Sequence, residues 1–259
     1  MGIVNVTPDS FSDGGKYAGE SAVSHGLALL EAGTDILDIG GESTRPGAAA
    51  VSEAEEIARV IPVIAGLRAK TQAHISIDTM KPAVAKAAIE VGANIWNDVA
   101  ALTAPGALEM AGKLKVPVVL MHMQGEPRTM QQAPHYENVL EEVGAFLRER
   151  ALAARAAGVS HLWIDPGIGF GKTIAHNLTL LSGLETLKKM TGERVLFGAS
   201  RKSMIQMIDG AKSAPEDRIG GSLALALIAA QNGADIIRVH DVRETAQALR
   251  VLRAAEGVK

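Results

Sequence analysis

The chain of 259 residues is 47% hydrophobic but only 3% aromatic, so it can bury a sizeable core built mainly from aliphatic side chains. A net charge of −3 argues against a nucleic-acid or anionic-membrane partner, and the absence of cysteine excludes disulfides, thiolate nucleophiles and zinc–sulfur sites. No stretch approaches the roughly 18 unbroken apolar residues of a membrane span, and the first residues lack the basic and apolar regions of a secretory signal. We therefore expect a cytoplasmic protein.

Short apolar runs alternate with helical patterns from one end of the chain to the other. We expect strands at Ile3–Val6, Ile36–Ile39, Ile75–Asp78, Ile95–Asp98, Val116–Met121, Leu162–Asp165, Val195–Gly198 and Ile236–Val239. This alternation indicates a parallel sheet with right-handed crossovers. Eight such units favour a closed (β/α)₈ TIM barrel of the α/β class over an open doubly wound sheet, and we expect one domain over residues 1–259.

Between the predicted strands, apolar residues repeat at steps of three and four, which is helical spacing. The clearest patterns cover residues 57–67, 139–147, 178–187, 221–232 and 245–255. Pro62 lies inside the first pattern and should kink that helix or remove one of its hydrogen bonds. Long loops are expected at Thr7–Gly19 and His122–His135. Both follow strands, so both should lie at the C-terminal face, where barrel enzymes place their sites.

Polar side chains stand at or near the C-terminal ends of the predicted strands. They are Asn5, Asp38, Asp78, Asn97, Asp98, His122, Asp165, Lys202, Arg238 and His240. Asp and Asn often close strands because they form turns, but that preference does not explain the cations on the later strands. In a barrel these side chains converge, so we expect a mouth with carboxylates and amides on one wall and cations on the other.

The stretch DILDIGGESTRPG at Asp35–Gly47 shows the same arrangement within one segment. An apolar strand carries an acid near its end and opens into a glycine-rich loop with Ser43, Thr44 and Arg45. Hydroxyls, a cation and a flexible backbone are suited to binding anions.

Two other patterns are weaker than they first look. DPGIGFGKT at 165–173 resembles a phosphate loop, but Pro166 occupies the position of the first required glycine, so a tight turn beside a ligand is expected instead. His25, His74 and His176 are expected at the surface. No set of residues has zinc-ligand spacing, and Ser10, Ser43 and Ser203 lack the nucleophile elbow of a covalent hydrolase.

Two longer segments, GIVNVTPDSFSDGG at 2–15 and LDIGGESTRPGA at 37–48, resemble the signature segments of the dihydropteroate synthase family. The resemblance continues in the family's order through SIDT at 76–79, NDV at 97–99, MHMQGEPRTMQ at 121–131, DPGIGFGK at 165–172, SRKSMI at 200–205 and RVHDV at 238–242. It covers essentially the whole chain, and each segment is long enough to be specific.

The resemblance implies an enzyme of folate synthesis. It would join p-aminobenzoate to 7,8-dihydropterin-6-ylmethyl diphosphate and release pyrophosphate and 7,8-dihydropteroate. The pterin ring would be held by Asp78, Asn97, Asp165 and Lys202, with Arg238 stacked on it. The diphosphate would meet Asn5 through Mg²⁺, together with Thr44, Arg45, Arg238 and His240. The p-aminobenzoate pocket would be formed by Phe11, Thr44, Pro46, Lys202 and Ser203.

The implied reaction is a displacement at a CH₂ carbon attached to an electron-rich ring. Because an aniline nitrogen is a modest nucleophile, we expect pyrophosphate to depart before attack. Mg²⁺, Arg45, Arg238 and His240 would stabilise the leaving group, and Asp13 would stabilise the pterin cation. The resemblance also implies sensitivity to sulfonamides, which imitate p-aminobenzoate, and a homodimer built through the later helices.

Two other classes of protein share parts of this pattern. A corrinoid-dependent methyltransfer module would share the barrel and the carboxylates that bind a pterin, but it has no diphosphate to bind, and so no use for SFSDGG, ESTRPG and SRKS. A degenerate paralogue kept as a binding protein would be expected to lose Arg45, Lys202, Arg238 or His240, and all four are present. Pyrophosphate release with both substrates would separate the three classes.

Overall fold

The structure is a computed structural model that describes residues 1–6, 16–43, 50–126 and 129–257. Its eight strands are β1 (Gly2–Asn5), β2 (Ile36–Gly40), β3 (His74–Asp78), β4 (Ile95–Asp98), β5 (Val118–Met121), β6 (Leu162–Asp165), β7 (Arg194–Phe197) and β8 (Ile236–Ile237). Each neighbouring pair in the order β1 to β8 is parallel. All eight predicted strands are therefore confirmed, with bounds that differ by at most two residues.

The sheet closes on itself between its first and last strands. The Ile3 N–H donates to the Val239 carbonyl at 3.0 Å, and the Val239 N–H donates to the Met1 carbonyl at 3.0 Å. Closure removes the two exposed edges that an open sheet would leave. The predicted (β/α)₈ barrel is confirmed.

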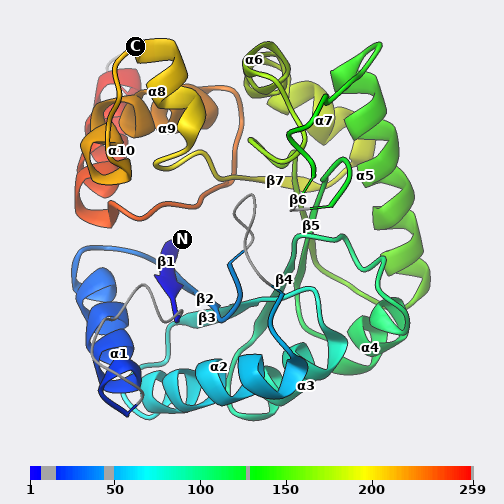
Figure 1. Cartoon of the computed structure of the whole chain (residues 1–259), viewed down its shortest axis with the longest axis vertical. Coiled ribbons are helices and arrows are strands. Elements are labelled where there is room, and N and C mark those ends of the chain that lie inside the picture. Colours follow the sequence, from blue (N-terminus) through cyan, green and yellow to red (C-terminus); the bar gives the residue numbers. More distant parts are fainter. Residues whose placement is uncertain (7–15, 44–49, 127–128, 258–259) are drawn as a thin grey trace.

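Helices surround the strands (Figure 1). They are α1 (Lys16–Glu31), α2 (Glu53–Arg68), α3 (Pro82–Glu90), α4 (Ala107–Leu114), α5 (Val139–Ala156), α6 (Ile174–Ser182), α7 (Leu184–Thr191), α8 (Ser203–Asp209), α9 (Ile219–Gln231) and α10 (Val242–Glu256), with a 3₁₀ turn η1 (Pro215–Arg218). No helix in the described part of the chain is both long and apolar enough to cross a membrane.

The structure corrects two local expectations. The pattern over 178–187 forms two helices that meet at Gly183, whose φ of −95° and ψ of 10° end α6 and begin α7. A Cβ at Gly183 would lie 2.5 Å from a methyl carbon of Leu140 on α5, so glycine is needed at this turn. Helix α2 continues through Pro62, which removes one hydrogen bond of the helix as expected, because proline has no N–H to donate. The loop expected over Thr7–Gly19 ends earlier, because α1 begins at Lys16.

The side chains that point into the barrel determine where a ligand can enter. Successive strand residues face opposite sides, so residues two apart share a face. Ile95, Val119 and Leu196 are buried together and pack with Met1, Ile36, Trp163 and Ile236. These apolar side chains fill the lower interior. The barrel is therefore closed at that level, and its polar residues lie above it, nearer the C-terminal ends of the strands.

Candidate active site

The inward face of several strands changes from apolar to polar within two residues. Ile36 is followed by Asp38, Ile95 by Asn97, Trp163 by Asp165, and Ile236 by Arg238. The pairing of the parallel strands brings the ends of β1 to β4 together as a polar layer, with Asp38 two residues below Gly40 on the same face. Asn5 pairs with Gly40, Gly40 with Asp78, and Asp78 with Asn97. This layer is the floor of the candidate site.

Arg238 lies between two carboxylates of this layer. Its Nε donates to Asp38 Oδ2 at 2.6 Å, and its second terminal nitrogen donates to Asp78 Oδ2 at 2.7 Å. Asn97 Nδ2 also donates to Asp38 Oδ2, at 3.2 Å. Asp38 is fully buried, whereas the side chains of Asp78 and Arg238 are 15% and 21% exposed. Asp38 therefore anchors the arginine from below, while Asp78 and Arg238 remain accessible from the mouth.

The charges in this layer are not balanced pair by pair. Burial raises the pKa of Asp78 to about 7, the Arg238 guanidinium opposes that rise, and the neighbouring Asp38 adds to it. Asp38 Oδ1 and the Ser76 hydroxyl, one strand away, are buried and have no hydrogen-bond partner among the described residues. Such atoms are costly unless a water or ligand satisfies them. The floor therefore offers hydrogen-bond acceptors that no described residue uses, beside the Arg238 guanidinium.

Asp165 forms a second wall with the turn that follows β6. Its Oδ1 accepts a hydrogen bond from the Gly167 N–H at 2.7 Å. Gly167 and Gly171 both have positive φ, and a Cβ would lie 1.8 Å from the His122 carbonyl oxygen and 2.4 Å from that of Gln124. Glycine is required because the turn packs directly against the backbone after β5. Burial raises the pKa of Asp165 to about 6, against the opposing effects of the Gly167 N–H and nearby cations.

The cations expected on the other wall come from the segments after β7 and β8. Lys202 Nζ lies 4.2 Å from the centroid of the Phe170 ring, a cation–π contact that crosses to the Asp165 turn. The residue before it, Arg201, has a φ of +59° and donates two hydrogen bonds to the Asp241 carboxylate. Ser200 Oγ accepts from the His240 N–H at 3.1 Å and lies 3.1 Å from His240 Nδ1. Lys202 and His240 are thus held by contacts between two strand ends.

The remaining predicted residues are distributed unevenly. Ser203 is exposed and begins α8. Phe11, Asp13, Thr44, Arg45 and Pro46 lie outside the described residues. His25 and His74 are exposed as expected, and His176 is half-buried because it takes part in the capping of α6 by Thr173.

Two strand-end residues turn away from the mouth. Asp98 follows Asn97 directly and so faces the opposite side, where its carboxylate accepts from the N–H groups of Ala100 and Leu102. His122 is buried, and its ring packs edge-on against Phe146 at 5.0 Å. Neither residue has the role in the mouth that its position in the sequence suggested.

The metal predicted at Asn5 can be tested against the space around it. A Cβ placed on Gly40 would lie 3.7 Å from Asp78 Oδ2 and 3.9 Å from Asn5 Oδ1, so two hard oxygen donors border the space above this glycine. Among the described residues no group of three His, Cys, Asp or Glu side chains could hold a metal by itself. These donors fit a magnesium ion held mainly by phosphate oxygens and water.

Sequence reasoning placed Asp38 among the carboxylates of the mouth without a specific partner or ligand, and it gave no role to Lys172, although both are buried charged residues. A charged residue inside an apolar strand such as ILDIG is itself a signal, since a buried charge needs a partner. For Lys172 there was no comparable signal, because it follows a loop.

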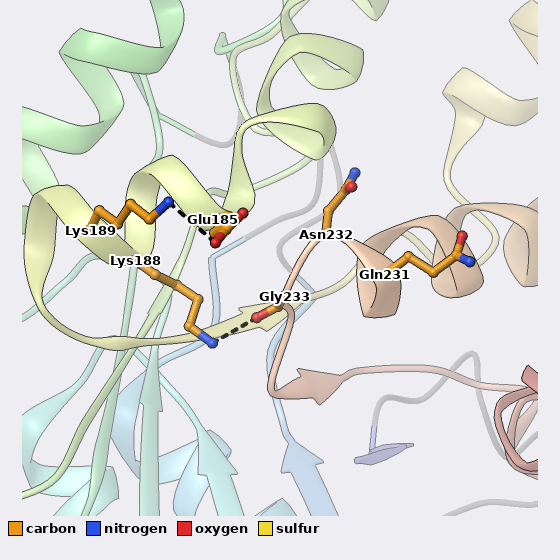
Figure 2. A pocket seen from close by; sticks show the side chains of 6 residues that line it. All are labelled: Glu185, Lys188, Lys189, Gln231, Asn232 and Gly233. Carbon is orange, nitrogen blue, oxygen red and sulfur yellow. Dashed lines mark hydrogen bonds and ion pairs between the residues drawn. The ribbon is translucent and has the colours of Figure 1, made fainter. Parts of the chain in front are cut away.

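A separate surface cavity of about 440 Å³ lies at the other end of the barrel. Its residues precede β7 and β8 in the chain, so it lies at the N-terminal ends of these strands. It is lined by Glu185, Lys188, Lys189, Gln231, Asn232 and Gly233 (Figure 2). Lys188 donates to the Gly233 carbonyl at 2.9 Å and pairs with Asp235 at 2.9 Å. The cavity contains none of the residues of the mouth.

The ion cluster predicts a pH-dependent loss of stability in Arg238→Met. Without the cation, the pKa of Asp78 rises further above its unfolded value, near 4. A carboxyl with a raised pKa in the folded state favours folding below its unfolded pKa, and this contribution disappears as pH rises through the folded value. In urea unfolding, Arg238→Met should therefore lose little free energy of unfolding near pH 5 relative to the wild type. Near pH 8 the loss should be about 3 kcal/mol, the lower end of the range for an uncompensated buried charge.

Arg155→Met is the matched control, because Arg155 makes a two-point contact with Glu193 at the outer surface. The Arg155 side chain is 42% exposed, so this pair contributes little, about 1 kcal/mol or less. If Arg238→Met lost the same stability at both pH values, the electrostatic description of the cluster would be wrong.

Comparison with known proteins agrees with this arrangement. The family model described as "Pterin binding enzyme" matches residues 1–240. The dihydropteroate synthase of Escherichia coli K12 is 49% identical over 262 residues, which is 100% of this chain and 92% of that protein. A dihydropteroate synthase structure from Xanthomonas albilineans with 4-aminobenzoic acid is 54% identical, with a TM-score of 0.94 over 100% of this chain and 93% of that one.

The structure of the Xanthomonas albilineans enzyme in complex with 7,8-dihydropteroate has a TM-score of 0.91 at 51% identity, over 100% of this chain and 94% of that one. These relatives are all synthases, so the comparisons do not favour the methyltransfer alternative. Family match, identity over the full chain and barrel geometry together place this chain in the dihydropteroate synthase family of pterin binding enzymes.

Proposed function

We propose that this protein catalyses the condensation of p-aminobenzoate with 7,8-dihydropterin-6-ylmethyl diphosphate to give 7,8-dihydropteroate and pyrophosphate. The observation that carries the proposal is the inward-facing polar layer. It gathers Asp78, Asn97 and Asp165 within one barrel and places Arg238 among them. One substrate and the product are supported by related synthase structures from Xanthomonas albilineans, one with 4-aminobenzoic acid and another in complex with 7,8-dihydropteroate.

The polar layer matches the edge of a pterin chemically. An aminopyrimidinone offers N–H donors, which carboxylates and an amide oxygen accept, and a carbonyl, which the Lys202 ammonium can satisfy. The Arg238 guanidinium is planar and can stack on a flat ring, which suits a chain with few aromatic residues. Asp78 can keep its bond to Arg238 and still bind ligand, because a carboxylate has about four acceptor sites.

The p-aminobenzoate pocket would adjoin this layer near the start of α8. Ser203 and Lys202 are the described residues that we assign to it, and Phe11, Thr44 and Pro46 are assigned on the family resemblance alone. A sulfonamide imitates p-aminobenzoate in shape and charge, so it should compete for this pocket.

The chemistry requires stabilisation of a leaving group and of a cation. Pyrophosphate departs before the aniline nitrogen attacks, and Arg238 and His240 hold its negative charge together with Arg45. Asp13 stabilises the positive charge left on the pterin. The carboxylates of the floor orient the ring so that its CH₂ group points toward the p-aminobenzoate pocket.

The assay for this proposal measures pyrophosphate release and dihydropteroate formation with both substrates. Pyrophosphate should be released in proportion to product, and a sulfonamide should inhibit competitively against p-aminobenzoate. Lys202→Ala should reduce kcat/KM for the pterin diphosphate, because losing one charge-assisted hydrogen bond costs about 1.5–3 kcal/mol. Protein that folds but forms no dihydropteroate would refute the proposed function.

We also propose that Mg²⁺ serves the reaction, with Asn5 as the residue that would hold it at the diphosphate. When bound, the ion would neutralise charge on the departing pyrophosphate. Activity should vanish with EDTA and return with Mg²⁺ or Mn²⁺, both hard ions that prefer oxygen ligands. Asn5→Ala should raise the Mg²⁺ concentration needed for half-maximal rate. Full activity under rigorous chelation would remove the metal from the mechanism.

We further propose a cytoplasmic homodimer that forms through the later helices. In support, Met207, Ile208, Ile228 and Val251 are large apolar side chains exposed by 43% to 65%, and they belong to α8, α9 and α10. Sedimentation should give twice the chain mass of 27.0 kDa. Met207→Asp should shift the protein toward the monomer, whereas Leu152→Asp, at an equally exposed apolar residue on α5, should not. A wild-type monomer at micromolar concentration would contradict the proposal.

A further inference from the structure

Lys172 is a buried lysine behind the Asp165 turn, and the reaction as described above does not use it. Its side chain is almost inaccessible, since the residue is 3% exposed. Its Nζ lies 2.9 Å from His122 Nδ1, 3.3 Å from the His122 carbonyl oxygen and 2.9 Å from the Phe170 carbonyl oxygen. Three acceptors match the three N–H groups of an ammonium. Lys172 thereby ties the end of β5 to the turn after β6.

The surroundings fix this lysine in place. The His122 ring packs against Phe146 and lies 6.1 Å from the Tyr136 ring, and the Tyr136 hydroxyl donates to the Gly171 carbonyl at 2.9 Å. A Cβ at Gly167 would lie 3.4 Å from Lys172 Nζ. Gly167 is the residue whose N–H binds the Asp165 carboxylate. The ammonium therefore lies directly behind the turn that orients Asp165.

We propose that Lys172 is a positioning residue for Asp165: its buried ammonium holds the turn after β6 and keeps the Asp165 carboxylate ionised, ready to accept hydrogen bonds from the pterin. This inference rests on the proposed function, because it assumes that Asp165 binds the ring. Lys172 does not touch the substrate, so its effect passes through Asp165 and the glycine turn.

The electrostatics of the two walls agree with this role. Burial raises the pKa of Asp165 to about 6, against the opposing effects of the Gly167 N–H and then of the charges on Lys202, Arg238 and Lys172. Burial and the positive charge of Lys202 lower the pKa of Lys172 to about 7, while Asp165 opposes that shift. Burial also lowers the pKa of His122 to about 3, so its imidazole is neutral. Lys172 is thus charged below about pH 7, the range in which Asp165 would otherwise take up a proton.

The pairing with His122 lets the lysine lose its proton without leaving a buried group unsatisfied. As an ammonium, Lys172 donates to His122 Nδ1 and to both carbonyls. As a neutral amine, Lys172 can still donate to the two carbonyls. The neutral His122 ring can then carry its proton on Nδ1 and donate it to the lysine nitrogen. An arginine in this place would have no accessible neutral form. Because Lys172 is paired with His122, it can lose or regain its proton near neutral pH, and the charge beside the Asp165 turn changes with it.

The experiment uses calorimetry to measure the affinity for the dihydropterin that lacks its diphosphate. Measurements run between about pH 5 and 8, where histidines, a carboxyl with a raised pKa and a lysine with a lowered pKa titrate. Omitting the diphosphate removes its own titration, and the titration of the pterin is measured separately. Wild-type affinity should fall as acid protonates Asp78 and Asp165. Asp165→Asn should remove the part of that pH dependence that belongs to Asp165 and leave the part that belongs to Asp78.

Lys172→Gln keeps N–H donors but removes the charge. Its midpoint for loss of affinity should move to higher pH, and below the wild-type midpoint its affinity should be about tenfold lower than that of the wild type for each unit of that movement. Lys172→Arg retains the charge and should keep the wild-type midpoint. Lys188→Gln is the control, because Lys188, like Lys172, donates to a backbone carbonyl but lies at the other end of the barrel (Figure 2). Its midpoint should not move.

The outcomes separate three cases. Equal weakening of Lys172→Gln at every pH, with an unmoved midpoint, would leave Lys172 only a structural role and overturn the inference. Wild-type protein that binds no dihydropterin at any pH would refute the proposed function instead. If Lys172→Gln fails to fold, carbon-13 shifts of the Asp165 and Lys172 side chains can be followed in the wild type. A lysine that remains charged while Asp165 titrates supports the inference, and a lysine already neutral there overturns it.

Discussion

Arg238, between the carboxylates of Asp38 and Asp78, joins the first half of this barrel to its last strand. Asp38 and Asp78 lie on β2 and β3, whereas Arg238 follows β8, 200 and 160 residues later in the chain. Parallel strands of a barrel bring such distant positions to one level, and the ion pairs then connect them. The side chains that line the mouth depend on this cluster, because it fixes the depth at which the apolar interior stops and the polar layer begins.

Most of the fold could be read from the sequence because its signals are local and repeated. Runs such as ILDIG and VVLM need burial on both faces, which a parallel strand between helices provides. The helices were predicted less completely, since Gly183 divides one apolar pattern into two helices through its contact with Leu140. That contact joins residues more than forty positions apart in the chain, and spacing along the sequence cannot reveal it.

The candidate site could be read only in part, for a related reason. A polar residue at a strand end was predicted to face the mouth, yet the face depends on strict alternation. Asn97 faces inward to Asp38, so Asp98 must face outward, where it caps the following turn. His122 lies in the core, where its ring packs edge-on against Phe146 of α5. The family resemblance supplied roles for loop residues that local chemistry alone could not have assigned.

Asp38 resolves a conflict that the cluster would otherwise contain. If Asp78 alone held Arg238, every ligand that used this carboxylate would compete with the arginine and release it from its position. Asp38 lies deeper, is fully buried and binds the Nε side of the guanidinium, so the plane of Arg238 is set from below. Asp78 can then share its oxygens with a ligand while the arginine stays in place. A carboxylate with no access to solvent thereby prepares both of its more exposed neighbours for binding, at the cost of one acceptor, Asp38 Oδ1, with no partner among the described residues.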